Sequence, residues 1–507
     1  MVRSSKYKIK NIIKKILDYY LKKYLKRSVS MKYTKIFNKI EYTVDTVKGE
    51  AYVSGVLDDD ITTAEILPKI SKYKVTTIDD EAFMNCTSLT TVTIPDSVTK
   101  INYNAFYGCY QLESVTIPDS VTEINDNAFS DCYSLESVKL GNSLTKIGDG
   151  AFSNCESLTE ITIPDSVTTL GNNIFEGCAE LKSVTIGNSV TEISDSAFKN
   201  CTSLTGITIP DSVTTIGNNA FENCEQLEIV TIGNSVTKIG NSAFFKCESL
   251  TAITIPDSVT TIGHNMFEDC IKLKTATIGN NVTEISDGAF SGCTSLTAIT
   301  ITDSVKSICD NAFEYCTSLT SITIGNSVTE IGDSAFKNCT SLTSIIIPDN
   351  VTRIANNTFW DCVQLENVTI GNGVTEIGDY AFSNCSSLIS ITIPDSVSEI
   401  GEGAFELCKS LISIAIPDNV TWVGNNAFWC CKQLENVTIG NGVPEIGYDV
   451  FSDCTSLTSI TIPNNVTSIC EGAFCNCTSL TSIIIINSLT EVGDDAFEGC
   501  TQLKKIL

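Results

Sequence analysis

Apolar residues return along this 507-residue chain at a constant interval of 23 positions. Cysteine occurs every 23 residues from Cys86 to Cys500, nineteen times in succession. Phenylalanine stands three residues before each of these cysteines, and leucine stands three residues after it. Self-similarity at a fixed period of roughly 20 to 50 residues is typical of repeat architectures. The hydrophobic pattern therefore predicts a solenoid in which each 23 residues complete one turn.

Each repeat predicts two short strands and one compact turn. The first segment reads Leu-x-x-Ile/Val-x-Ile, as at Val92-Thr93-Ile94, and its alternation predicts a half-buried strand. A Pro-Asp or Gly-Asn turn follows, and then a second short strand with the pattern Val-Thr-x-Ile. The last segment, Asp-x-Ala-Phe-x-x-Cys, has a helix-capping residue and an apolar spacing of three, which fits one helical turn. We expect mainly short parallel β-strands with a 3₁₀ or short α turn per repeat.

Charge divides the chain into unequal parts. Residues 1–40 hold thirteen Lys or Arg against one acid, Asp18, whereas the rest holds 20 basic and 59 acidic residues. Residues 9–25 place apolar side chains at helical spacing among lysines, so 1–40 are predicted to be a basic amphipathic helical leader. This leader could contact an anionic membrane peripherally, and a solvated leader is the alternative. Residues 41–85 predict a degenerate N-terminal capping repeat, and residues 86–507 the solenoid.

The ends of the chain carry few signals of location. No secretory signal peptide or membrane-spanning stretch is visible, because the apolar residues near the N-terminus are interrupted by lysines. The sequence alone thus suggests a cytoplasmic or membrane-peripheral protein. At the other end, residues 503–507 resemble the start of another strand, whose open edge could favour edge-to-edge self-association.

Composition argues against catalysis and metal binding. His264 is the sole histidine, which removes multi-histidine metal sites and leaves nucleophilic triads almost no base. Phosphate-binding glycine motifs are missing as well. The acidic repeats repel the phosphates of nucleic acids. The nineteen regularly spaced cysteines are expected to be buried, reduced thiols. We predict no catalytic residue, no cofactor, no metal site and no nucleic-acid partner.

The repeat Leu-x-x-Ile-x-Ile-Pro-x-Ser-Val-x-x-Ile-x-x-x-Ala-Phe-x-x-Cys resembles the BspA-type, or Treponema pallidum-type, leucine-rich repeat. The resemblance covers nearly all of residues 41–507 and rests on Ile-Pro-Asp-Ser-Val and Ala-Phe-x-x-Cys in fixed register. It implies a leucine-rich-repeat solenoid and a surface antigen or adhesin that binds host or matrix proteins and other cells. The resemblance therefore suggests the cell surface, and the location stays open between the two interpretations.

Binding residues are expected at outward positions where the copies differ. Thr follows the Val or Leu that opens the second-strand segment in 15 of 18 copies. The strand propensity of Thr explains this, and an array of Thr side chains that orders water is the alternative. Large aromatic side chains are enriched in protein interfaces, so those that replace small or charged residues are candidate binding residues. Chance substitution at surface positions is the alternative. The candidate partner-binding residues are Trp360, Trp422, Trp429, Tyr107 and Phe245.

These observations favour a non-catalytic recognition or adhesion scaffold that binds proteins or surface glycans through its repeat surface. The alternative is an intracellular protein–protein interaction scaffold that the basic N-terminal helix holds at a membrane face.

Overall fold

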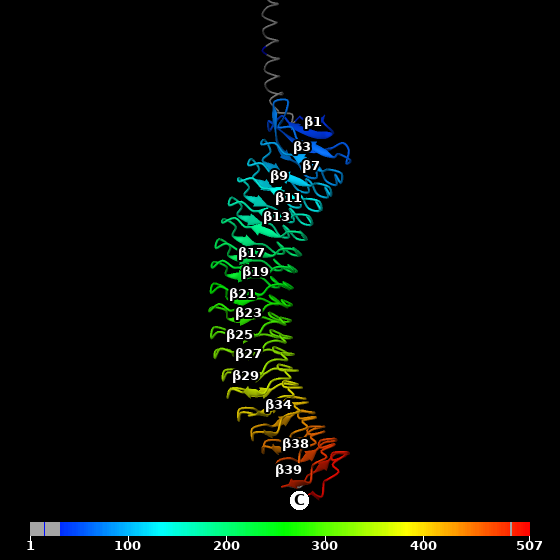
Figure 1. Cartoon of the computed structure of the whole chain (residues 1–507), viewed down its shortest axis with the longest axis vertical. Helices are drawn as coiled ribbons and strands as arrows, with labels where there is room; N and C mark the ends of the chain where they lie inside the picture. The colour runs from blue at the N-terminus through cyan, green and yellow to red at the C-terminus, as the bar shows by residue number, and fades with distance from the viewer. Residues whose placement is uncertain (1–14, 16–30, 487–488, 507) are drawn as a thin grey trace, which may run out of the picture. The chain divides into compact units, whose positions relative to one another are not determined.

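The computed structural model describes residue 15, residues 31–486 and residues 489–506. The chain divides into two compact units, residues 1–155 and residues 156–507. Within each unit, short strands stack turn upon turn in chain order (Figure 1). The predicted solenoid of 23-residue turns is therefore confirmed, whereas the helix predicted over residues 9–25 lies outside the described residues except for Lys15.

The first unit begins with an antiparallel cap. Strands β1 (Lys32–Phe37), β2 (Ile40–Asp45) and β3 (Glu50–Val56) pair antiparallel, and β3 then pairs parallel with β6 (Tyr73–Ile78). Residues 31–40 were predicted as the end of a helical leader, and this boundary was wrong. Asn38 and Lys39 both have positive φ, 50° and 66°, which is the backbone of a tight two-residue hairpin turn.

Beyond the cap, the first unit holds two ladders of parallel strands in a register of one repeat. The first ladder consists of β4 (Thr63–Glu65), β7 (Thr91–Thr93), β9 (Ser114–Thr116) and β11 (Ser137–Lys139). The second consists of β6, β8 (Lys100–Ile101), β10 (Glu123–Ile124) and β12 (Lys146–Ile147), with β5 (Lys69–Ile70) antiparallel to β6.

The second unit repeats this arrangement. Its first-strand ladders comprise β13 (Glu160–Thr162), β15 (Ser183–Thr185), β17 (Gly206–Thr208), β19 (Ile229–Thr231), β21 (Ala252–Thr254), β23 (Thr275–Thr277), β25 (Ala298–Thr300), β27 (Ser321–Thr323), β29 (Ser344–Ile346), β31 (Asn367–Thr369), β33 (Ser390–Ile391), β35 (Ser413–Ala415), β37 (Asn436–Thr438), β39 (Ser459–Ile462), β41 (Ser482–Ile485) and β43 (Lys505–Ile506). Its second-strand ladders comprise β14 (Thr169–Leu170), β16 (Glu192–Ile193), β18 (Thr215–Ile216), β20 (Lys238–Ile239), β22 (Thr261–Ile262), β24 (Glu284–Ile285), β26 (Ser307–Ile308), β28 (Glu330–Ile331), β30 (Arg353–Ile354), β32 (Glu376–Ile377), β34 (Glu399–Ile400), β36 (Trp422–Val423), β38 (Glu445–Ile446), β40 (Ser468–Ile469) and β42 (Glu491–Val492).

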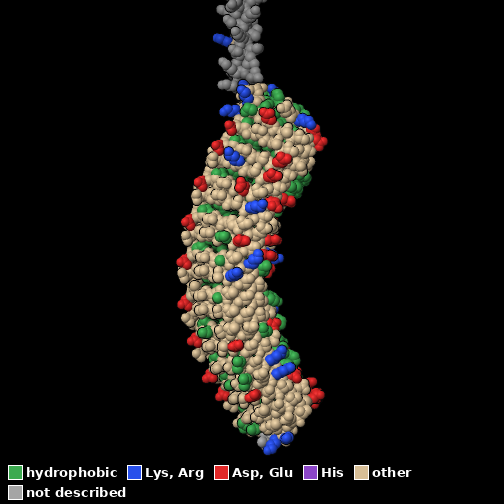
Figure 2. All heavy atoms as spheres, in the orientation of Figure 1, with side chains coloured by type: hydrophobic (Ala, Val, Ile, Leu, Met, Phe, Trp, Pro, Cys, Tyr) green, Lys and Arg blue, Asp and Glu red, His purple; other side chains and the backbone are tan. Residues whose placement is uncertain are grey.

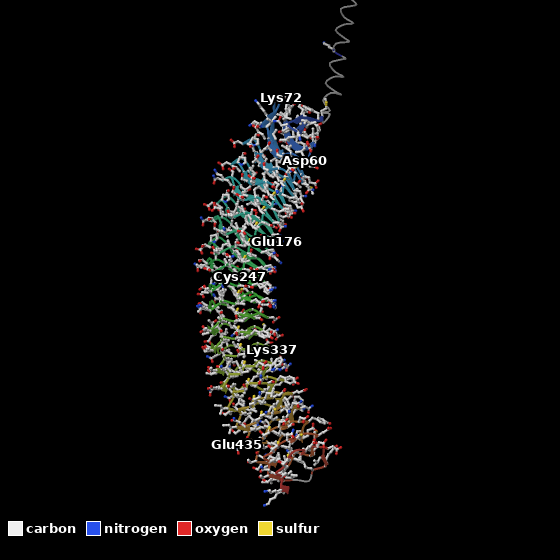
Figure 3. The ribbon with its side chains drawn as sticks, turned by 45° about the vertical axis from the view of Figure 1, so that its right-hand side comes forward. Asp60, Lys72, Glu176, Cys247, Lys337 and Glu435 are labelled. Carbon is white, nitrogen blue, oxygen red and sulfur yellow. The ribbon has the colours of Figure 1, made fainter. Side chains whose placement is uncertain are left out.

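The core is a set of parallel stacks of identical side chains. In the second unit, the phenylalanine rings of successive turns lie nearly parallel, as for Phe221 and Phe244, whose centroids are 5.3 Å apart. The cysteines are free thiols, and from Cys109 onward the buried thiols recur as donors to the carbonyl of a phenylalanine in the preceding turn, as Cys247 Sγ donates to Phe221 O at 3.2 Å (Cys247 is labelled in Figure 3). Aromatic pairs add roughly 0.5–1.5 kcal/mol each beyond their buried area, so the stack stabilises the turn-to-turn interface.

The Ala-Phe-x-x-Cys segment folds differently from the helical turn that the spacing predicted. Asn219 and Asn223 both have a φ of 57°, and left-handed residues at these two places recur in the other turns. The N–H of Phe221 donates to the carbonyl of Ala243 in the next turn at 2.8 Å, rather than within its own segment. Left-handed residues interrupt a helix, and the N–H groups that they redirect hold successive turns together.

The alternation of Pro-Asp and Gly-Asn turns has a structural cause. The Asp165 carboxylate accepts a hydrogen bond from the Asn188 N–H at 2.7 Å. A Cβ atom added to Gly187 would lie 2.5 Å from the carbonyl oxygen of Pro164, which is closer than real Cβ contacts. At this position, therefore, glycine lets the turn stack closely on the carbonyl of the preceding proline.

Candidate binding surface

We call the residue directly after each core phenylalanine the corner position. Phe245, Trp360 and Trp429 all occupy it in the second unit, but five and then three turns separate them. Trp360 is 36% exposed, and the other two side chains are half-buried. The structure therefore does not gather these three predicted residues into one patch.

Two of the corner aromatics are covered by lysines of this chain. The Nζ atom of Lys337, from the turn before Trp360, lies 4.7 Å from the centre of the indole ring (Lys337 is labelled in Figure 3). Lys337 also pairs with Glu314 at 3.1 Å, so a carboxylate, an ammonium group and an aromatic ring follow one another over three turns. Lys246 Nζ lies 5.1 Å from the centre of the Phe245 ring. Cation–π contact already uses one face of each ring.

Tyr107, in the first unit, belongs to a cluster of tyrosines. A hydrogen bond to the Asp131 side chain raises the pKa of Tyr107, and Tyr110 and Tyr133 lie close enough to raise it further. The rings of Tyr110 and Tyr133 stack with centroids 5.0 Å apart, and both side chains are 38% exposed. Sequence reasoning missed this pair, although two tyrosines 23 residues apart at one repeat position could have indicated it.

Trp422 lies on a different surface from the corner position. We define the strand-two face as the outward side chains of the second strands and of the turn after each. Trp422, in β36, is 46% exposed and stands in register with Glu399 of β34. Trp429, only seven residues later, lies at the corner, so the two tryptophans of this turn occupy different surfaces.

The strand-two face next to Trp422 is acidic and carries a further aromatic residue. Tyr448, which the sequence analysis did not single out, is 53% exposed. Beside it is a pocket of about 480 Å³, whose lining includes Glu445, Tyr448, Cys470, Glu471, Glu491 and Asp494. Burial raises the pKa of the Cys470 thiol, and the Glu445 and Glu491 carboxylates raise it further. These carboxylates therefore make the pocket electronegative.

The ladder of second strands is interrupted just after Trp422. In neighbouring turns, the backbone N–H at this repeat position donates to the carbonyl of the preceding turn. The Thr421 N–H donates to Ser398 O and the Thr467 N–H to Pro444 O, both at 2.8 Å. Pro444 takes the place of that threonine and has no N–H to donate. One ladder ends with β36, and the next begins with β38.

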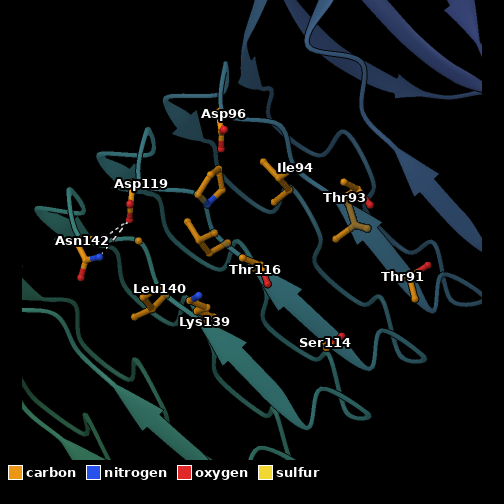
Figure 4. A pocket seen from close by; sticks show the side chains of 14 residues that line it. Thr91, Thr93, Ile94, Asp96, Ser114, Thr116, Asp119, Lys139, Leu140 and Asn142 are labelled. Atoms are coloured by element: carbon orange, nitrogen blue, oxygen red, sulfur yellow. Dashed lines mark hydrogen bonds between the residues drawn. The ribbon is translucent and has the colours of Figure 1, made fainter.

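A second pocket lies on the first-strand side of the first unit. Its volume is about 510 Å³, and strands β7, β9 and β11 and the turns that follow them supply its lining (Figure 4). Thr93 and Thr116 lie on the sheet, Lys139 takes the equivalent place in β11, and the Asp119 side chain accepts from the N–H of Asn142 at 2.8 Å. This polar, open groove has no cluster of reactive side chains.

Threonines that follow the second-strand valine have a structural role. The Thr214 hydroxyl donates to the Thr191 carbonyl at 3.2 Å, and the Thr237 hydroxyl donates to the Thr214 carbonyl at 3.2 Å. Equivalent bonds recur in both units. Because these hydroxyls bond to the chain, their recurrence needs no array that orders water.

The described residues form neither a metal-binding cluster nor a membrane-spanning helix. In the part of the chain that the structure describes, no group of three or more His, Cys, Asp or Glu side chains could hold a metal ion. Within those same residues, no helix is long and apolar enough to cross a membrane. His264 lies at the surface with Nδ1 3.3 Å from an Asp287 carboxylate oxygen.

The repeat geometry agrees with a family comparison. A family model described as "BspA type Leucine rich repeat region (6 copies)" matches residues 67–182, 171–297, 283–410 and 375–504, which together cover most of the chain. The chain belongs to the BspA-type leucine-rich repeat family. This confirms the predicted resemblance, and BspA-type repeats are scaffolds for binding and adhesion in general.

Solved structures of leucine-rich repeat proteins are similar to this chain. A leucine-rich repeat protein from Bacteroides ovatus is 29% identical, with 85% of this chain and 95% of that chain covered and a TM-score of 0.51. The T. pallidum leucine-rich repeat protein TpLRR is 26% identical, with coverage of 43% and 91% and a TM-score of 0.35. A leucine-rich cell surface protein from Faecalibacterium prausnitzii is 24% identical, with 94% of each chain covered and a TM-score of 0.31. A comparison with curated proteins gave no match.

Proposed function

We propose that this BspA-type chain is a non-catalytic recognition scaffold that binds protein or glycan partners through its repeat surface, as an adhesin does. The observation that carries the proposal is the exposure of Trp422 and Tyr448 on one face of a regular acidic array. Large aromatic side chains that remain exposed are frequent anchors of interfaces. The uniform core, by contrast, fixes only how the turns stack.

The proposal is tested by binding the purified full-length chain to matrix proteins and to a panel of surface glycans. Saturable binding should weaken when Trp422 and Tyr448 are both changed to alanine. The matched control is Trp360→Ala, because Lys337 already covers that ring, and it should change binding less. Absence of saturable binding to the whole panel, or equal binding by all variants, would contradict the proposal.

An adhesion role also requires the repeats to be outside the cell. An antibody against residues 156–507 should label intact cells that express the protein, with the same intensity before and after permeabilisation. Labelling that appears only after permeabilisation would instead favour the intracellular scaffold with a membrane-bound N-terminal segment.

A further inference from the structure

We propose that the strand-two face around Trp422 receives an arginine or lysine side chain of a protein partner. This inference rests on the proposed recognition function and specifies its chemistry. The cation would lie over the Trp422 indole, between the carboxylates of Glu399 and Glu445.

The position of the carboxylates follows from the repeat register. Glu399 is the register partner of Trp422, and Glu445 occupies the same repeat position one turn later. Parallel neighbours in a ladder are about 4.8 Å apart, which places the Glu399 strand beside that of Trp422. Glu445 lies beyond the ladder break, but its turn stays stacked on that of Trp422, since the core rings of Phe428 and Phe451 in the two turns are 5.4 Å apart. A cation over the ring would be close to both.

The charged neighbours of another surface tryptophan, Trp360, differ from those of Trp422. At Trp360, the residue one turn earlier is Lys337, whose ammonium group lies 4.7 Å from the ring centre. At Trp422, the corresponding neighbours on both sides are glutamates. Among the described residues, no lysine or arginine lies over the Trp422 ring or forms an ion pair with Glu399 or Glu445. The surroundings that attract a cation are present, whereas the chain supplies no cation there.

Basic residues are rare on this part of the surface. Between residues 377 and 503 the chain has two, Lys409 and Lys432, and each directly follows a core cysteine rather than a second strand. Glu376, the previous carboxylate in the ladder, is neutralised by Arg353 at 2.9 Å, so the uncompensated stretch begins at Glu399. Figure 2 shows acidic side chains recurring along one edge of the visible face, with basic side chains at several places on it.

Among cations, a guanidinium group fits these surroundings best. It is planar, stacks on aromatic faces and donates several hydrogen bonds to flanking carboxylates. A neutral sugar could stack on the indole but would leave the charge of Glu399, Glu445 and Glu491 unbalanced. Charge complementarity therefore favours a basic peptide segment over a neutral glycan.

The test uses the full-length protein and a fluorescent peptide of alternating arginine and glycine, with a citrulline–glycine peptide of the same length as the uncharged probe. The arginine peptide should bind more tightly than the citrulline peptide, and its affinity should fall as the salt concentration rises. Trp422→Ala should weaken arginine-peptide binding by about two- to fivefold, as expected for an exposed cation–π contact. Trp422→Phe should retain part of the affinity.

A matched pair of charge variants separates this site from general acidity. Glu399→Gln with Glu445→Gln should weaken binding several-fold, whereas Glu284→Gln with Glu330→Gln should not, although both pairs remove two charges from the same ladder position. Equal losses in the two pairs, equal binding of the two peptides or no effect of Trp422→Ala would each overturn the inference. Thermal melting should be unchanged in all these variants, because the altered side chains are at the surface.

The outcome also distinguishes this inference from the broader proposal. If a glycan binds in a Trp422-dependent way while the arginine peptide does not, the cation site is refuted and the recognition scaffold stands. If neither the arginine peptide nor any member of the protein and glycan panel binds, both are refuted.

Discussion

At the scale of single residues, the preference for glycine in the Gly-Asn turns comes from contact with the neighbouring turn, not from the backbone of its own turn. Gly187→Ala should destabilise the second unit by about 1–3 kcal/mol, because the new Cβ would lie 2.5 Å from the Pro164 carbonyl oxygen. Gly206→Ala is the matched control, since its Cβ would meet nothing closer than 3.5 Å. Chemical unfolding followed by circular dichroism measures both, and equal midpoints would contradict the steric explanation.

The buried thiols should resist modification in the native state. Burial raises the pKa of Cys86 to about 12, and burial likewise raises the pKa of other ladder thiols such as Cys247 and Cys293. Iodoacetamide should therefore label first the partly exposed thiols, which are Cys309, Cys430, Cys470, Cys475 and Cys500. Mass spectrometry of the native protein at pH 8 tests this, with labelling in guanidinium as the control. Rapid native labelling of Cys247 would contradict it.

The same thiols predict a loss of stability in alkali. Below about pH 8 they are protonated in both folded and unfolded chains, so they add no pH dependence. As pH rises past the ordinary value of 9.0, thiols of the unfolded chain ionise while the buried ones stay protonated. The unfolded state then binds fewer protons, so the free energy of unfolding falls. The denaturant midpoint should be lower at pH 9.5 than at pH 7.5, and an unchanged midpoint would contradict this account.

At the scale of elements, the inter-turn hydrogen bonds decide where a ladder continues. Pro444→Thr would restore the N–H that neighbouring turns use at this point, so a hydrogen bond from residue 444 to the Thr421 carbonyl should form. Hydrogen exchange should show the new amide at residue 444 to be as protected as that of Thr421, and the gain in stability should be about 1 kcal/mol. An amide that exchanges as fast as an unfolded peptide would show that another feature separates the strands.

Elements also show the limits of the sequence pattern. The alternation in Val92-Thr93-Ile94 correctly predicted β7, because a strand with one buried face needs only local information. The Phe-x-x-Cys spacing predicted a helical turn, yet alternate backbone N–H groups there, such as those of Phe221 and Asn223, bond to the next turn. Spacing alone cannot distinguish these outcomes, since both bury the same side chains.

At the scale of the whole molecule, repeats of this kind stabilise one another mainly as nearest neighbours. Deleting residues 187–232 removes one Gly-Asn and one Pro-Asp repeat and preserves the alternation. The product should fold and melt within a few degrees of the full chain, by differential scanning calorimetry.

The matched deletion is residues 210–232, which removes fewer residues but stacks two Gly-Asn turns directly. The Asn188 side chain would then have to accept the hydrogen bond from the backbone N–H of the next turn, as the Asp165 carboxylate does for Asn188 in the full chain. A neutral amide oxygen accepts a weaker hydrogen bond than a carboxylate. This shorter deletion should melt lower than the longer one. The opposite order would show that the alternation has no energetic role.

The sequence by itself determined the 23-residue period, the inward-facing residues and the family, because stacked identical turns require the same apolar side chain at the same place. The tertiary structure alone decided the surface. It placed Trp422 and Trp429 on different faces, covered Trp360 with Lys337 and brought Tyr110 and Tyr133 together. Outward side chains are free of the constraint that fixes the core, so their partners depend on which residues the neighbouring turns happen to present.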